Sequence, residues 1–256
     1  MKQRSEIILE AVCFNSGSVL AAASGGADRI ELCAAPSEGG ITPSHAMIRW
    51  ALSAVTIPVF IMIRPRGGDF LYSREEVEIM KQDILECRSL GVPGVVFGIL
   101  KKDGSVNFTL CKELVKLAHP MSCTFHRAFD MTKDKIPALE DVIGCGFERI
   151  LTSGGEQSAQ QGKQLIAELH RKAGGRIIVM PGGGVNVTSI ETLAEFTGLK
   201  EYHVSGRKYI PGGMEYYHGG ISISADPLED RQSLTVDPEQ LQKIRQLAER
   251  ALPNVM

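Results

Sequence analysis

The chain has 256 residues, 43% of them hydrophobic, which is enough for one large core, so we expect residues 1–256 to form a single domain. Lysine and arginine total 28 against 30 aspartate and glutamate residues, so the chain lacks the excess positive charge that gathers nucleic acid or anionic membranes. Neither a nucleic acid nor a membrane is therefore expected as a partner.

Two further features indicate a cytoplasmic protein. No secretory signal pattern opens the chain, and no run of 18 apolar residues occurs in it. The six cysteines are scattered through apolar segments, without the spacing of a disulfide scaffold or a zinc knuckle, at positions 13, 33, 87, 111, 123 and 145. Reduced thiols are expected.

Short apolar runs alternate with longer helical patterns from one end of the chain to the other. In chain order, the pattern predicts a strand over 7–13 with a helix over 16–24, then 29–33 with 44–55, 59–63 with 73–90, 94–100 with 108–118, 122–126 with 136–143, 149–152 with 159–172, 177–180 with 189–196, and 202–205 with 238–251. This gives eight strand–helix units.

Eight such units in succession predict a single (β/α)₈ TIM barrel of the α/β class. A doubly wound sheet with a dinucleotide site is the alternative, but Phe14-Asn15-Ser16-Gly17 follows the first strand where a GxGxxG turn would be needed. No nucleotide cofactor is expected. Residues 207–236 remain as one long loop, a length that usually has a functional or assembly reason.

Polar residues appear where the predicted strands end, and in this fold such residues meet at the carboxyl mouth of the barrel. Five of them are candidate catalytic residues: Glu10, Glu31, Arg64, His126 and Asp130. Carboxylates, an imidazole and a guanidinium at one mouth would suit proton transfer next to an anion. The alternative is that the glutamates and Arg64 only neutralise one another, and that His126 is a hydrogen-bonded interior residue.

Glycine-rich turns follow the last two strands, where barrels of this kind often bind phosphate. Gly183 and Gly184 follow the seventh strand, and Ser205, Gly206 and Arg207 follow the eighth. We expect them to bind a small anion through backbone N–H groups, with Arg207 as counter-charge. The alternative is that these glycines only turn the chain.

Cys13 and Cys33 end neighbouring strands, and two close thiolates would hold Cu(I) well. The alternative interpretation is that both pack as small hydrophobic side chains, as free cysteines commonly do.

Six longer motifs stand out in the chain: GADRIELC at 26–33, EGGITPS at 38–44, IRPRGGDFLYS at 63–73, TFHRAFDM at 124–131, LTSG at 151–154 and MPGGG at 180–184. Together, over about residues 10–205, they resemble the CutC copper-homeostasis family. The resemblance implies a (β/α)₈ barrel, a cytoplasmic location, a homo-oligomer such as a dimer or tetramer, and a role in copper binding or tolerance.

The first strand departs from the family pattern. Members commonly have Glu-Val-Cys there, whereas this chain has one more residue between Glu10 and Cys13. Because side chains alternate along a strand, these two should face opposite sides unless a bulge intervenes, which makes Cys33 the more favoured ligand. Three functions fit these features: a Cu(I)-binding copper-homeostasis protein, an enzyme acting on a small phosphorylated or carboxylated metabolite, and a barrel retained mainly for assembly, which would need the charges at the strand ends to be satisfied among themselves.

Overall fold

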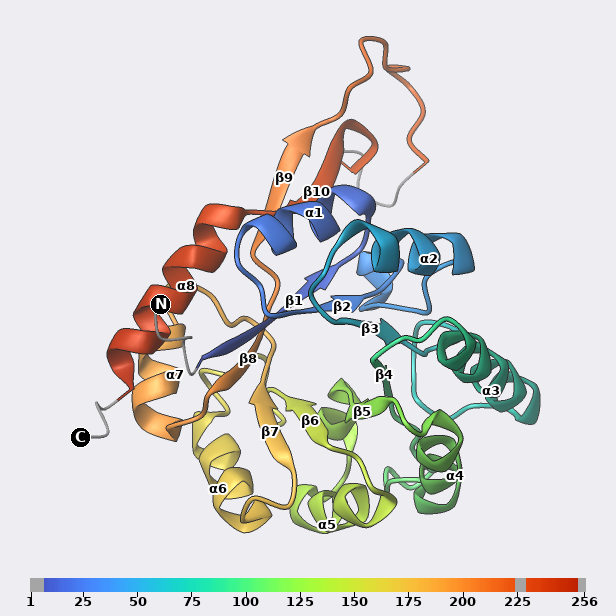
Figure 1. Ribbon diagram of the computed structural model, residues 1–256, viewed down its shortest axis with the longest axis vertical. Helices are drawn as coiled ribbons and strands as arrows, with labels where there is room; N and C mark the ends of the chain where they lie inside the picture. The colour runs from blue at the N-terminus through green and yellow to red at the C-terminus, as the bar shows by residue number, and fades with distance from the viewer. Residues whose placement is uncertain (1–6, 224–228, 253–256) are drawn as a thin grey trace.

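The computed structural model describes residues 7–223 and 229–252, and eight parallel strands form a barrel at its centre (Figure 1). The strands are β1 (Ile8–Cys13), β2 (Arg29–Leu32), β3 (Val59–Met62), β4 (Gly94–Phe97), β5 (Ser122–Phe125), β6 (Arg149–Thr152), β7 (Ile178–Pro181) and β8 (Glu201–Val204). The helices outside them are α1 (Ser16–Ser24), α2 (His45–Ala54), α3 (Arg74–Ser89), α4 (Phe108–Ala118), α5 (Lys135–Cys145), α6 (Lys163–Ala173), α7 (Ile190–Thr197) and α8 (Pro238–Ala251). The expected (β/α)₈ architecture is confirmed.

From β1 to β7 each strand pairs with the next one along the chain, and β1 also pairs with β8, so the hydrogen-bonded order runs from β7 through β1 to β8. No ladder joins β7 to β8 in the described chain, but the two lie side by side and complete the ring (Figure 1). All carboxyl ends of the strands therefore surround one mouth, as parallel pairing requires.

Local sequence explains where several helices begin. The side chains of Asn15 and Ser44 accept hydrogen bonds from backbone N–H groups in the first turns of α1 and α2. Ser73 and Glu76 form a reciprocal capping box at the start of α3. These caps stabilise helices whose apolar faces then pack on the barrel.

The core has two layers. The larger layer lies between strands and helices and is almost entirely apolar. Inside the barrel, a smaller cluster contains Val12, Cys33, Phe60, Met62 and Val96, with Phe14 packed against it. Polar and charged side chains occupy the remaining interior, and these form the site described below.

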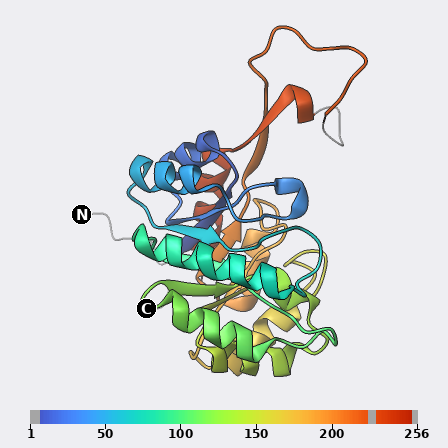
Figure 2. The same cartoon turned by 90° about the vertical axis from the view of Figure 1, so that its right-hand side faces the viewer.

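Residues 207–236, expected to be one long loop, contain a β-hairpin. Strands β9 (Arg207–Pro211) and β10 (Gln232–Val236) pair antiparallel, and a short 3₁₀ turn, η3 (Glu229–Arg231), precedes β10. The hairpin projects from the barrel beyond α1 (Figures 1 and 2). Its strands carry mostly exposed side chains, so they lack the one-sided apolar pattern that sequence reasoning detects.

Other boundaries shift by a few residues. The fourth strand stops at Phe97 and the sixth helix starts at Lys163, whereas the sequence predicted 94–100 and 159–172. The chain after β5 forms a 3₁₀ turn, η2 (Arg127–Met131). Among the described helices, none combines the length and apolar character needed to cross a bilayer.

Candidate functional site at the carboxyl mouth of the barrel

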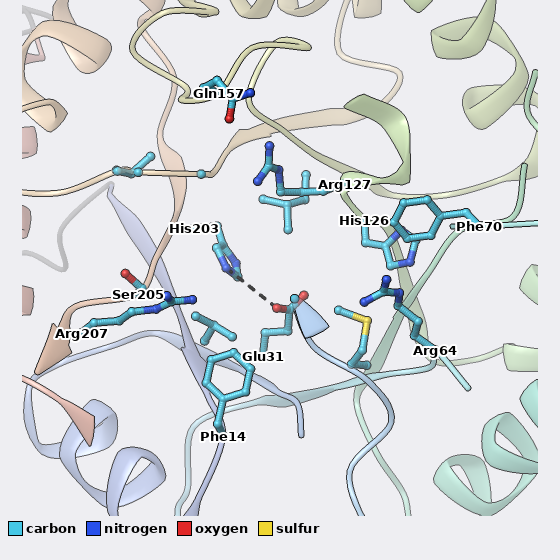
Figure 3. Close-up of a pocket in the computed structure, with 17 residues that line it drawn as sticks. Phe14, Glu31, Arg64, Phe70, His126, Arg127, Gln157, His203, Ser205 and Arg207 are labelled. Atoms are coloured by element: carbon cyan, nitrogen blue, oxygen red, sulfur yellow. Dashed lines mark ion pairs between the residues drawn. The ribbon is translucent and has the colours of Figure 1, made fainter. Parts of the chain in front are cut away.

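A pocket of about 390 Å³ opens at the carboxyl ends of the strands (Figure 3). Seven residues selected from the sequence line it: Glu31, Arg64, His126, Gly183, Gly184, Ser205 and Arg207. Phe14, Phe70, Arg127, Gln157 and His203 are among the other lining residues. Glu10, Asp130, Gly206 and the two candidate cysteines lie outside the lining.

Arg64 and His126 form one side of the pocket together with Phe70 (Figure 3). The guanidinium of Arg64 lies 5.0 Å from the centre of the Phe70 ring, and the His126 ring packs edge-on against the same ring at 4.9 Å. Arg64 donates to the backbone carbonyls of Glu38, Gly40 and Gly68. These bonds fix its position but supply no carboxylate to neutralise it.

His126 is a neutral imidazole held in one tautomer. Burial, helped by the nearby charge of Arg64, lowers the pKa of His126 to about 3. Its Nδ1 accepts a hydrogen bond from the backbone N–H of Ala128 at 3.3 Å, so the ring proton resides on Nε2. His126 can therefore donate a hydrogen bond but does not serve as a base near neutral pH.

Glu31 projects into the pocket between His203 and Arg64 (Figure 3). Its Oε2 lies 3.8 Å from Nε2 of His203 and 3.6 Å from Sγ of Cys33. Burial raises the pKa of Glu31 to about 7, so this carboxyl group can gain and lose a proton near neutral pH. Such a group is suited to acid–base chemistry.

Glu10 lies below the pocket and is fully buried. It pairs with Arg29, and its Oε1 lies 2.8 Å from Nδ1 of His203. Burial opposes the ionisation of Glu10, but Arg29 and His203 outweigh it and lower the pKa of this carboxyl to about 2. Burial likewise opposes the protonation of His203, but the carboxylates of Glu31 and Glu10 outweigh it and raise the pKa of this imidazole.

Arg29 also pairs with Glu201, which in turn pairs with Arg149. Ligand atoms of Glu10, Glu31 and His203 lie within 4.8 Å of one another and could together offer oxygen and nitrogen to a cation. Because Arg29 and His203 already engage Glu10, we interpret this group as a charge-balanced floor that orients His203.

Asp130 organises a loop rather than lining the pocket. Its carboxylate accepts hydrogen bonds from the backbone N–H groups of Ser153 and Gly155 and pairs with Arg127 at 2.8 Å. Since η2 turns the chain immediately after His126, Asp130 reaches the loop after β6 at the rim of the mouth instead of the pocket. It positions Arg127, which does line the pocket.

The loop after β7 supplies backbone donors. Gly183 and Gly184 have φ angles of +91° and +73°, which favour glycine. The N–H groups of Gly183, Gly184 and Val185 have no acceptor in the described structure, although all three residues line the pocket. Gly206, in contrast, packs against Leu241 under the hairpin.

The two candidate copper ligands lie in different layers. Strands β1 and β2 pair without a bulge, with Val12 opposite Glu31, so Cys13 faces the helices while Cys33 faces the barrel interior. The pair therefore does not form a ready chelate. Cys33 belongs to the same interior cluster as Met62, and a Cβ placed on Gly40 would lie 3.1 Å from the Cys33 Sγ and 3.7 Å from the Met62 methyl carbon.

His203 is a site residue that sequence reasoning missed. It lies inside the predicted strand 202–205, whereas the candidates from the sequence are polar residues at the points where apolar runs stop. A signal was present: His203 lies two residues before Ser205, so both face the same side of β8, and both line the pocket.

A family model and curated relatives identify the lineage. The sequence model of the CutC family matches residues 7–208. A human protein named "Copper homeostasis protein cutC homolog" is 46% identical over 226 residues, 88% of this chain and 83% of that protein. A CutC family protein of Chromobacterium violaceum is 42% identical, covering 95% of this chain and 99% of its own length.

Solved structures agree. The crystal structure of a protein described as the CutC of Streptococcus agalactiae matches with a TM-score of 0.73 at 31% identity, covering 77% of this chain and 97% of its own. An N-(5'-phosphoribosyl)anthranilate isomerase of Pyrococcus furiosus matches with a TM-score of 0.56 at 14% identity, covering 95% and 99%, which shows a shared fold alone. The chain belongs to the CutC copper-homeostasis protein family.

Proposed function

We propose that this chain serves copper homeostasis in the cytoplasm by binding Cu(I) at Cys33. The names of its curated relatives support the copper role. The observation that carries the site is that Cys33 and Met62 belong to one cluster inside the barrel. Thiolate and thioether sulfur are the ligands that Cu(I) prefers.

Protonation of the Cys33 thiol is the main obstacle to metal binding, because the thiolate is the ligand form. Burial and the adjacent Glu31 raise the pKa of its thiol well above the usual range, so binding of a metal there would release a proton. Cu(I) affinity should therefore increase with pH. Competition with a Cu(I) chelator under reducing conditions tests the site: equal affinities of wild type, Cys33→Ser and Met62→Leu would refute it.

A second function is favoured by the polar atoms of the pocket. Five buried side-chain polar atoms have no hydrogen-bond partner among the described residues, and three of them, Glu31 Oε1, Arg64 Nε and His126 Nε2, belong to residues that line this one pocket. Native proteins rarely leave such atoms unpaired without a ligand or water. We infer a site where an enzyme acts on a small phosphorylated or carboxylated metabolite.

The experiment for this second function is a thermal-shift screen of small metabolites, followed by activity assays on those that bind. Ligands of the site should raise the unfolding midpoint of the wild type but not of Glu31→Gln or His126→Gln variants. If no phosphorylated or carboxylated compound separates wild type from these variants, the enzyme hypothesis is wrong.

We also propose that the chain forms a homo-oligomer, a dimer or tetramer, through its hairpin. Tyr216 and Ile223 in the segment between β9 and β10 are 71% and 91% exposed, and Met214 and Ile221 nearby are also exposed. Two-stranded hairpins are marginal alone, and exposed apolar side chains gathered on one projection favour contact with another copy.

A further inference from the structure

The geometry points to a more specific ligand: a small phosphate monoester that carries a carboxylate or carbonyl group at its other end. This inference rests on the second proposed function, because it names the class of metabolite that the pocket would accept. The phosphate would bind at the loop after β7, and the second group would bind between Arg64 and His126.

The phosphate end is built from backbone donors. Three successive N–H groups, those of Gly183, Gly184 and Val185, lack acceptors in the described structure. The N–H of Ser205, which lines the same pocket directly after β8, also lacks one. Successive free N–H groups at a glycine turn form a concave donor set that binds tetrahedral oxyanions. The positive φ angles of both glycines hold the turn in this shape.

Two arginines flank these donors. A Cβ added to Gly183 would lie 3.2 Å from the guanidinium carbon of Arg127. Because glycine has no side chain, space for an anion remains between the loop and this positive charge. Arg207 lines the pocket from the other side, is exposed, and has no ion-pair partner among the described residues (Figure 3). Asp130 pairs with Arg127 and so balances one of these two charges.

Charge at the mouth also favours a ligand with more than one negative group. Three arginines, Arg64, Arg127 and Arg207, line the pocket, and Glu31 is the one carboxylate among the lining residues. Guanidinium groups match phosphate and carboxylate oxygens with paired donors. The lining therefore has more positive charge than its own carboxylate can balance.

The second group of the ligand has its own donors. The protons on His126 Nε2 and Arg64 Nε have no acceptor, and both side chains are more than nine-tenths buried. A neutral imidazole and a guanidinium beside one ring, that of Phe70, suit a carboxylate or polarised carbonyl oxygen. Apolar Val12, Phe14 and Leu151 leave space for a short carbon chain between the two ends.

Titration calorimetry with three probes separates the two ends: inorganic phosphate, glycolate and 2-phosphoglycolate, which joins both groups. We expect 2-phosphoglycolate to bind more tightly than either single-ended probe. Arg207→Gln should weaken phosphate and 2-phosphoglycolate binding by about tenfold or more, since a charge-assisted contact is lost. Arg171→Gln on α6, an exposed arginine outside the pocket, removes the same charge and should change neither affinity.

His126→Gln should weaken 2-phosphoglycolate and glycolate while leaving inorganic phosphate unchanged. If this variant is unstable, the side-chain nitrogen resonances of wild-type His126 give the same information: 2-phosphoglycolate should shift the Nε2 signal and inorganic phosphate should not. Phosphate binding that Arg207→Gln leaves intact, or 2-phosphoglycolate that binds no better than phosphate, would overturn the inference. Tight binding of phosphate-free carboxylates, unaffected by Arg207→Gln, would overturn it while leaving an enzyme at this mouth in place.

Discussion

The largely buried imidazole of His203 pairs with the fully buried carboxylate of Glu10 across the β8–β1 junction, with Nδ1 and Oε1 2.8 Å apart. The hydrogen bond fixes the imidazole so that Nε2 faces Glu31 and the pocket (Figure 3). Because Glu10 also pairs with Arg29, one carboxylate connects the floor of the barrel to the acid–base residues at its mouth.

Glu10→Gln should therefore destabilise the barrel by about 3 to 5 kcal/mol at pH 7, because the buried guanidinium of Arg29 keeps only Glu201 as a partner and the imidazole of His203 loses its hydrogen-bonded carboxylate. The pKa of Glu10 is lowered to about 2, so its contribution is fully present above the unfolded-state pKa near 4.5 and is lost as the pH falls through 2. Urea unfolding of both proteins at pH 7 and at lower pH measures this.

The difference between wild type and Glu10→Gln should shrink as the solution is acidified. Glu140→Gln is the matched control, since Glu140 pairs with Arg176 on the exposed surface and such pairs contribute little. A Glu10→Gln protein as stable as the control variant would contradict the assigned role of the floor.

Strand ends were the most informative sequence feature for the site. Glu31, Arg64 and His126 lie at the ends of β2, β3 and β5, and parallel pairing brings them to one pocket although they are far apart in the sequence. Asp130 could not be placed this way, because the 3₁₀ turn that redirects it has no distinctive sequence pattern.

The hairpin shows a second limit of the sequence. Its strands have hardly any buried face, so the alternation that reveals a barrel strand is missing. The paired residues Pro211 and Gln232 are also 21 positions apart in the sequence, too far for a short hairpin turn to signal the pairing. The inward direction of His203 follows from the alternation of side chains along β8, a signal that lies within the strand and not at its end.

Gly94→Ala tests how closely the barrel interior is packed. A Cβ at this position would lie 2.5 Å from the Phe60 ring, and that ring is in contact with the guanidinium groups of Arg29 and Arg149. Overpacking of this kind should cost about 1 to 3 kcal/mol in free energy of unfolding. Gly213→Ala is the control, since nothing lies within 4 Å of its added Cβ. Equal stability of the two variants would show that Phe60 moves freely.

Cys33→Ser should lower the Cu(I) affinity by at least about tenfold, whereas Cys13→Ser should change it little. The reason is geometric: Cys33 faces the barrel interior near Met62, while Cys13 packs among the helices. Cys145→Ser, a buried thiol that contacts Phe108 on α4, controls for the loss of any cysteine. If Cys13→Ser lost as much affinity as Cys33→Ser, the metal site would have to bridge both layers.

Replacing Tyr216 and Ile223 together by serine should weaken self-association without changing the fold. Both side chains project into solvent from the hairpin, 71% and 91% exposed, so their removal opens no cavity in the barrel core. Light scattering coupled to gel filtration over a range of protein concentrations gives the oligomer mass. Leu20→Ser on α1, at a side chain that is 50% exposed, removes a surface hydrophobic group outside the hairpin and should leave that mass unchanged. An oligomer that the double variant retains at every concentration, with wild-type mass, would place the contact between copies on another face of the barrel.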